Sequence, residues 1–321
     1  MLSRRHLRIK VLQALYAFTL SSNDRMDAGE RELLRSLDKL YEIYIYQLSL
    51  VIEIVNFAKK RLGENKLKFF PTEDDLNPST RFIDNRFYQK LSENADFERY
   101  VEKFKINWAD QEDMIRKLML EVRETKEFQA YMAADECSFD DDKEIFISIF
   151  KKVFAKSEIL EYYFGERSIY WSDDFAASNL LAIKTIKSWD ESWNERVKLP
   201  SIFDNGASSK EHEDKQFILN LFRKTILRSS DYDKLIDEKV KNWEMDRIAL
   251  MDMLLIKMAL VEILESPSIP IKVTLNEYIE LAKTYSTPKS KVFVNGILDK
   301  LVADLKAQNK IKKTGRGLME G

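Results

Sequence analysis

The stretch IPIKVTLNEYIELAKTYSTPKSKVFVNGILDKL, residues 269–301, is the part of the chain that decides the fold. Pro267 just before it and Pro270 near its start stop the preceding helix. Thr274 and Glu277 have the spacing of a capping box, in which the threonine hydroxyl accepts a backbone amide and the glutamate reaches back to the cap. This pattern predicts a helix over 275–285.

The second half of the same stretch predicts one more helix, over 288–307. Thr287 followed by Pro288 has the form of an N-cap with proline at the first helical position. Asn295 and Gly296 then indicate a close contact between helices, because glycine lets two backbones approach. The two helices follow each other with only a short connection.

Apolar residues recur every three to four positions through most of the remaining chain, which is typical of amphipathic helices. Eight glycines and six prolines in 321 residues leave little material for the hairpins of a sheet protein. We therefore predict an all-α fold. The expected helices cover 3–20, 28–62, 81–93, 95–106, 109–134, 142–163, 212–229, 231–241 and 244–265.

Loops are expected where proline, glycine and acidic residues gather, at 63–80 (with Gly63 ending a helix) and at 135–142. The segment 198–212 has the composition of a linker. A weak internal repeat pairs 143–157 with 215–229 at an offset of 72 residues. Chance similarity between amphipathic helices and a copied helical unit both explain this repeat.

The inventory of reactive side chains disfavours an enzyme. Cys137 is the single cysteine and there are two histidines, so the sequence offers no disulfide framework, no zinc spacing and no catalytic triad. We expect no catalytic residue, no metal and no cofactor. No uninterrupted apolar run has the roughly 18 residues of a membrane span, and the expected location is the cytoplasm without a membrane.

Charge is divided unevenly along the chain, although its net value is only −2. Residues 1–23 carry +4 and residues 212–321 carry +3, whereas residues 24–211 carry −9. The basic ends indicate an anionic partner, and an acidic middle is also explained by solubility alone.

Three segments resemble the NusB family, in the order in which the family has them. They are RRHLRIKVLQALYAF at 4–18, the helix 243–262 that closes with Glu262, and the stretch 269–301. The resemblance implies an all-α, NusB-like helical bundle enlarged by a long helical insertion.

The domain organisation follows from where the resemblance stops. Residues 1–23 and 212–310 form the expected NusB-like RNA-binding domain. Residues 24–211 form an acidic helical insertion, with a partial repeat of the C-terminal helical unit if the repeat is real. Residues 311–321 are expected to be a basic flexible tail.

Arg4, Arg5 and Arg8 lie on consecutive turns of the first expected helix. Guanidinium groups at this spacing can follow successive phosphates of one strand. A solvated basic face without a ligand explains the same spacing. The resemblance favours RNA, because these positions match arginines that contact RNA in the family.

The start of the last expected helix supplies a second set of candidate RNA-binding residues, Lys289, Ser290, Lys291 and Phe293. Backbone amides and lysines at a helix start attract anions. Helical spacing alone favours Phe293 as a core residue over a base-stacking platform. The resemblance favours RNA binding for the whole set.

Asp246 and Asp252 are the candidate partner-binding residues. They are six residues apart, which does not suit a catalytic carboxylate pair, and a solvated face explains them simply. The resemblance implies that they face NusE, a ribosomal protein that also acts in antitermination, since a basic protein is attracted to carboxylates.

The resemblance thus implies a non-catalytic RNA-binding transcription antitermination factor. It would act with NusE and the transcription elongation complex on single-stranded, boxA-like RNA of the nascent rRNA leader. The alternative is an all-helical protein-interaction scaffold that binds no RNA. A methyltransferase is disfavoured, because no glycine-rich loop follows a predicted strand.

Overall fold

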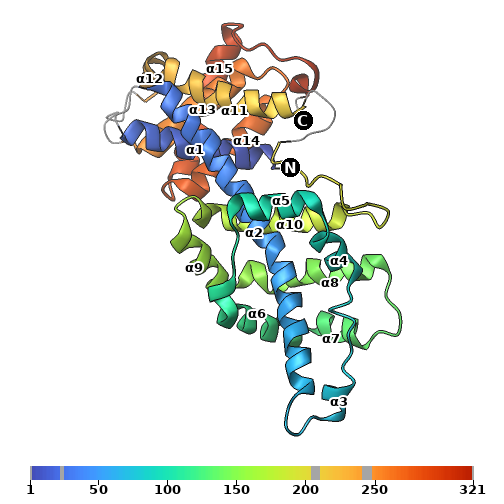
Figure 1. Cartoon of the computed structure of the whole chain (residues 1–321). Coiled ribbons are helices and arrows are strands. Elements are labelled where there is room, and N and C mark those ends of the chain that lie inside the picture. Colours follow the sequence, from blue (N-terminus) through green and yellow to red (C-terminus); the bar gives the residue numbers. More distant parts are fainter. Residues whose placement is uncertain (1, 22–24, 204–209, 241–247, 320–321) are drawn as a thin grey trace. The chain divides into compact units, whose positions relative to one another are not determined.

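The structure, a computed structural model, describes residues 2–21, 25–203, 210–240 and 248–319, with the side chains of 74 and 210–212 left out (Figure 1). Within these ranges every regular element is a helix, so the all-α prediction is confirmed. The helices are α1 (Arg4–Leu20), α2 (Met26–Lys66), α3 (Glu73–Leu76), α4 (Arg86–Ser92), α5 (Ala95–Phe104), α6 (Glu112–Glu124), α7 (Lys126–Ala133), α8 (Phe139–Lys152), α9 (Glu158–Arg167), α10 (Trp171–Ser188), α11 (Lys210–Leu227), α12 (Ser229–Asp237), α13 (Leu250–Glu265), α14 (Ile271–Tyr285) and α15 (Ser290–Ala307).

The chain divides into two compact units. The middle unit is Leu37–Ile202, and the terminal unit combines Leu2–Ser36 with Phe203–Gly321. The middle unit therefore begins inside α2, later than the predicted insertion 24–211. The first turns of α2 belong to the terminal unit, where Arg223 of α11 forms an ion pair with Glu30.

The helix α2 forms the core of the middle unit, and the helices α4 to α10 surround its later part (Figure 1). Ile43, Ile45, Leu48 and Leu50 are all fully buried although they point in different directions from one helix. A helix that is apolar nearly all round favours burial, and residues 43–51 of α2 are all buried.

Polar contacts position α2 among its neighbours. The Tyr44 hydroxyl lies 2.8 Å from the Oγ1 of Thr185 on α10, and the Trp171 indole donates to the carbonyl of Lys39 at 2.9 Å. By length and composition α2 could cross a membrane, but 72% of its most apolar window is buried. This burial is typical of a core helix.

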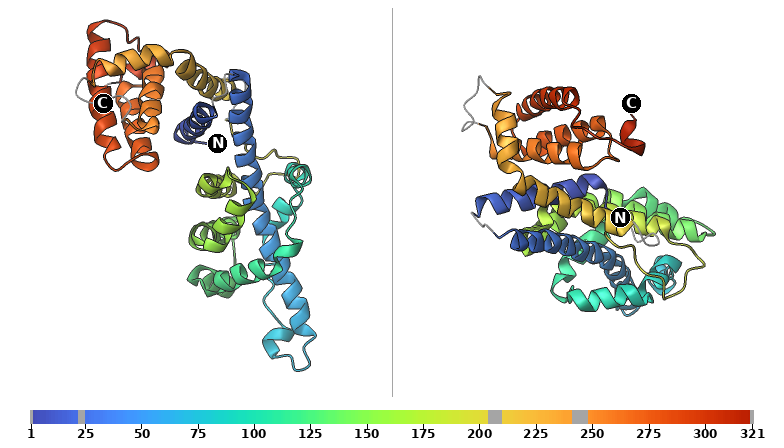
Figure 2. Two further views of the ribbon diagram at one scale, coloured as in Figure 1. Left: turned by 90° about the vertical axis from the view of Figure 1, so that its left-hand side faces the viewer. Right: turned by 90° about the horizontal axis from the view of Figure 1, so that it is seen from above.

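The terminal unit is built on α13, which contacts α1, α11, α14 and α15. Leu255, Ile256, Met258 and Leu260 of α13 are fully buried. Figure 2 shows α13, α14 and α15 gathered side by side, and α11 lies along α1. The terminal unit is thus assembled from two segments that are far apart in the sequence.

The internal repeat corresponds to a repeated order of helices. Shifted by 72 residues, α8 and α9 fall on α11 and α12, and the later part of α10 falls on α13. α8 packs on α10 as α11 packs on α13, and the matched rings of Phe150 and Phe222 are both fully buried. The pairs of Trp171 with Trp243 and Asp174 with Asp246 extend into residues outside the described ranges.

Several local predictions are wrong. α14 begins at Ile271, so Thr274 lies inside the helix and forms no capping box with Glu277. α2 continues through Gly63 to Lys66. A Cβ at Gly296 would meet nothing within 4 Å, so this glycine makes no close contact between helices.

The end of the chain is folded against the α13–α14 connection, in place of the predicted flexible tail. Residues Gly315–Leu318 form a 3-10 turn. The Thr314 amide and the Lys313 ammonium donate to the carbonyls of Pro267 and Ser266, both at 3.0 Å. Burial lowers the pKa of Lys313.

Gly317 can be tested as the residue that allows this docking. A Cβ at Gly317 would lie 1.9 Å from the Pro267 carbonyl oxygen, which is backbone and cannot move aside cheaply. We expect Gly317→Ala to lower the free energy of unfolding by about 1–3 kcal/mol, measured by urea denaturation. The matched control Gly296→Ala should be neutral or stabilising by about 0.5–1 kcal/mol. Equal stability of the two variants would contradict the docked arrangement.

Candidate nucleic-acid interface

The three candidate arginines lie on α1. Each of them forms an ion pair with a carboxylate from another helix of the terminal unit. Leu7, Val11, Leu12 and Leu15 are buried and fix which face of α1 points inward. The Ser3 hydroxyl caps the helix by accepting a hydrogen bond from the backbone amide of His6, the third residue of α1. The arginines differ in exposure, so each is described separately.

Arg8 is buried, with 3% of its side chain exposed, and it forms a two-pronged ion pair with Glu262 of α13. Its Nε and Nη2 donate to the two carboxylate oxygens at 2.7 and 2.8 Å. Burial alone would lower the pKa of Arg8, but the hydrogen bonds and charge of Glu262 outweigh burial and raise it. Arg8 therefore stays charged and holds α1 on α13.

Glu262 is fully buried and gathers three partners from two other helices. Besides Arg8, it accepts hydrogen bonds from the Thr274 hydroxyl at 2.8 Å and the Tyr278 hydroxyl at 3.3 Å, both on α14. A buried carboxylate needs such partners to offset its lost hydration. This cluster joins α1, α13 and α14.

Arg5 lies at the surface, with 49% of its side chain exposed, and is also paired. Its Nε and Nη2 donate to Glu277 of α14 at 2.9 and 2.8 Å. The hydrogen bonds from Arg5 lower the pKa of Glu277. The Glu277 carboxylate thus binds the two donor groups of Arg5 that a phosphate would use.

Arg4 is partly exposed and pairs with the start of α11. Its Nε donates to Asp214 at 3.1 Å, and Glu213 lies at 3.9 Å. Its guanidinium also lies 5.2 Å from the centre of the Phe217 ring. Together the three arginines face four carboxylates, so the arginine face carries no excess positive charge.

The start of α15 is held by a buried aspartate. Ser290 is 1% exposed, and its hydroxyl donates to Asp252 at 2.8 Å, while the Ser286 hydroxyl donates to the other Asp252 oxygen at 2.6 Å. Asp252 is itself buried. Ser290 and Asp252 thus fix the α14–α15 connection and do not face solvent.

Lys289 and Lys291 flank Ser290 and are exposed. Within the described ranges neither ammonium group forms an ion pair or a side-chain hydrogen bond. Phe293, one turn further along α15, is partly exposed. Among the predicted RNA-binding residues, these two lysines are the ones whose charges are unpaired in the described part of the chain. Asp246, a predicted partner-binding residue, lies outside the described residues.

The candidate residues are distributed over two parts of the terminal unit. α1 contacts α11 and α13, and α15 contacts α13 and α14. The Arg5–Glu277 pair joins α1 to α14, the helix whose C-terminal end leads to Lys289. α14 therefore connects the arginine face with the start of α15.

Comparison with known proteins identifies a region that begins in α10 of the middle unit and continues through most of the C-terminal part of the terminal unit. The sequence profile of the NusB family matches residues 176–303. The transcription antitermination protein NusB of Koribacter versatilis is 36% identical over 144 residues, which cover 99% of that protein and 40% of this chain. This chain belongs to the NusB family.

Two further NusB proteins share higher identity over shorter regions. The protein of Salinibacter ruber is 44% identical over 105 residues and that of Chloroherpeton thalassium 42% over 106 residues. The matches span 66% and 50% of these two proteins, and 33% of this chain in each case. No solved structure matches the chain.

The NusB match contains Glu262, Glu277 and Lys291, whereas α1 lies outside it. The sequence did not reveal that these two glutamates neutralise the arginines. Glu277 had been interpreted as a capping residue. The useful signal for Glu262 was a charged residue at the end of an apolar run, a place where a buried partner is needed.

The Arg8–Glu262 pair can be tested by removing its members singly and together. Arg8→Met leaves a buried carboxylate without a counter-charge, so we expect the free energy of unfolding to fall by about 3–5 kcal/mol. The double variant Arg8→Met, Glu262→Leu should lose less than the sum of the single changes. Arg5→Gln, which removes an exposed pair, should cost no more than about 1 kcal/mol.

Urea denaturation of the unaltered chain, Arg8→Met, Glu262→Leu, the double variant and Arg5→Gln measures these differences. Additive losses in the double variant would show that Arg8 and Glu262 stabilise the fold independently of each other. That outcome would contradict the buried pair as the link between α1 and α13.

Proposed function

We propose that this chain is a non-catalytic RNA-binding transcription antitermination factor. It binds a boxA-like single-stranded segment of the nascent rRNA leader, together with NusE and the transcription elongation complex, in the cytoplasm. The observation that carries the proposal is the identity of 36% over nearly the whole length of a NusB protein named for transcription antitermination.

The RNA surface is centred on the start of α15. Lys289 and Lys291 are exposed, and no carboxylate of the described residues pairs with them, so they are available for phosphates. Arg4 and Arg5 form the second rim, where a phosphate would compete with Glu277 for the Arg5 fork. Arg8 and Ser290 support the surface by positioning α1 and α15.

The NusE contact is assigned to Asp246, which lies outside the described residues. Asp252 does not suit this contact, since it is buried and bound to two serine hydroxyls. The alternative of a scaffold without RNA binding is favoured by one observation, namely that carboxylates already pair all three arginines. An RNA titration separates the two functions.

The salt dependence of RNA binding tests the role of Lys291. Each lost phosphate contact lowers the magnitude of the log affinity versus log salt slope by about 0.7 for a single strand. We expect this decrease for Lys291→Gln, measured by fluorescence anisotropy with a boxA-like RNA, and a similar loss for a scrambled RNA. The control Lys117→Gln, at an exposed lysine of α6, should leave the slope unchanged.

Equal slopes for the Lys291 and Lys117 variants would place the RNA on another surface. No binding by the unaltered chain at low salt would support the scaffold alternative. Thermal melts of each variant show whether the fold is intact.

Phe293→Leu tests whether RNA bases stack at the start of α15. A base stacked on an aromatic ring contributes about 1–3 kcal/mol, so the variant should bind the boxA-like RNA about tenfold or more weakly. Stability should change little, because Phe293 is only partly buried. A large fall in melting temperature with unchanged affinity would show that the ring serves the core instead.

A further inference from the structure

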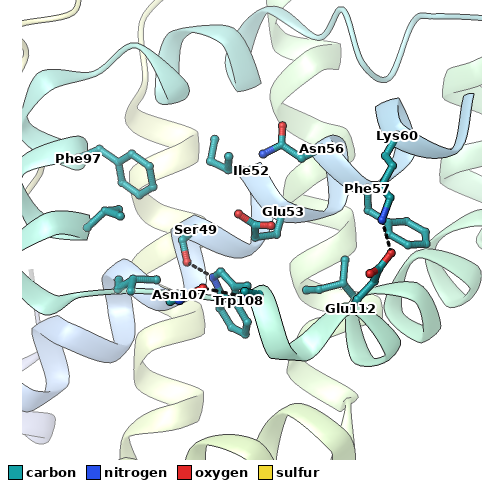
Figure 3. A pocket seen from close by; sticks show the side chains of 14 residues that line it. Ser49, Ile52, Glu53, Asn56, Phe57, Lys60, Phe97, Asn107, Trp108 and Glu112 are labelled. Carbon is teal, nitrogen blue, oxygen red and sulfur yellow. Dashed lines mark hydrogen bonds and ion pairs between the residues drawn. The ribbon is translucent and has the colours of Figure 1, made fainter. Parts of the chain in front are cut away.

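The middle unit contains a cavity of about 430 Å³ between α2, α5 and the start of α6 (Figure 3). Its walls are largely apolar. The side chains that form them include Ile52, Phe57, Phe97, Val101, Ile106, Trp108 and Ile115. All of these residues belong to the middle unit, so the cavity is independent of the RNA surface.

Contacts with neighbouring side chains hold the aromatic wall in place. The Trp108 indole donates to the Ser49 hydroxyl at 2.9 Å, and its ring packs edge-on against Tyr46 and stacks on Tyr163. Trp108 and Phe97 are almost fully buried. The cavity is therefore formed by the fold and does not depend on loose surface side chains.

Glu53 extends from α2 into this apolar space, and Figure 3 shows its carboxylate between Phe97 and Trp108. Within the described ranges the carboxylate forms no hydrogen bond or ion pair. Burial raises the pKa of Glu53. The Glu53 side chain is partly exposed, so its carboxylate faces the open side of the cavity, where a ligand can reach it.

The other polar groups of the cavity already have partners. The side-chain oxygen of Asn56 accepts a hydrogen bond from the Tyr88 hydroxyl at 3.0 Å, and the side-chain oxygen of Asn107 accepts one from the Ala109 backbone amide at 2.8 Å. Lys60 pairs with Glu112 at 2.6 Å, so their charges offset each other. Among the charged groups that line the cavity in the described part of the chain, Glu53 is the one with no oppositely charged group paired to it.

We propose that this cavity binds an organic cation, a primary ammonium or guanidinium group on an alkyl stem. The cation donates a charge-assisted hydrogen bond to Glu53, and the stem lies along Phe97, Ile106 and Trp108. The middle unit, 37–202, carries a net charge of −7, which attracts a cation from a distance. The charged group could come from a free polyamine or from a lysine or arginine side chain of a protein.

Calorimetric titration with n-hexylamine and n-hexanol tests the proposal on the full chain. The two probes share a stem and differ in charge, so we expect hexylamine to bind at least tenfold more tightly. Glu53→Gln keeps the shape of the side chain and should remove this preference. Glu112→Gln, at the exposed ion pair with Lys60, is the matched control and should retain it.

A second variant addresses the cavity itself. Val101→Trp fills the space from α5 and should weaken both probes, while a thermal melt reports whether the chain is folded. Equal affinity for amine and alcohol, or an amine preference that survives Glu53→Gln, would overturn the assignment. Absence of hexylamine binding at millimolar concentration would overturn it as well.

Two further titrations distinguish the sources of the cation. Spermidine represents a free polyamine, and a short lysine peptide represents a protein side chain, with a norleucine peptide of the same length as its neutral control. Tighter binding of spermidine assigns the cavity to a small molecule. Tighter binding of the lysine peptide over the norleucine peptide assigns it to a protein partner. Because RNA is absent from all titrations, their result does not depend on the proposed antitermination function.

Discussion

The terminal unit depends on one buried ion pair, that of Arg8 with Glu262. Both groups lose nearly all of their hydration, a cost that their mutual attraction offsets only when further hydrogen bonds complete the site. Thr274 and Tyr278 supply those bonds to Glu262. Four residues from three helices are therefore required together, and the position of α1 on the bundle follows from them.

The ion pairs of α1 also change how the basic N-terminal segment is interpreted. Sequence spacing placed Arg4, Arg5 and Arg8 on neighbouring turns of one helix, and this placement is correct. Spacing shows which residues share a face, but it does not show what that face is packed against. The carboxylates of Asp214, Glu262 and Glu277 come from distant segments, so the neutralised arginine face could be found only in three dimensions.

The helices and their order were predictable because the spacing of apolar residues and the composition are local properties of the chain. The burial of α2 followed from its apolar residues on every side. Details that depend on tertiary contacts were not predictable: Thr274 serves Glu262 and not a cap, and a Cβ at Gly296 meets open space. The cavity around Glu53 belongs to this class too, since a glutamate in a long apolar helix does not reveal whether it has a partner.

The joining of Arg8 to Glu262 also sets an order of events during synthesis. The middle unit is one continuous segment that is complete at residue 202, whereas the terminal unit needs residues from both ends of the chain. Domains generally fold as their segments leave the ribosome, and long-range contacts form late. We therefore expect the middle unit to fold while α1 is still without its partner helices, so that the nascent chain exposes its arginines until α13 and α14 have been made.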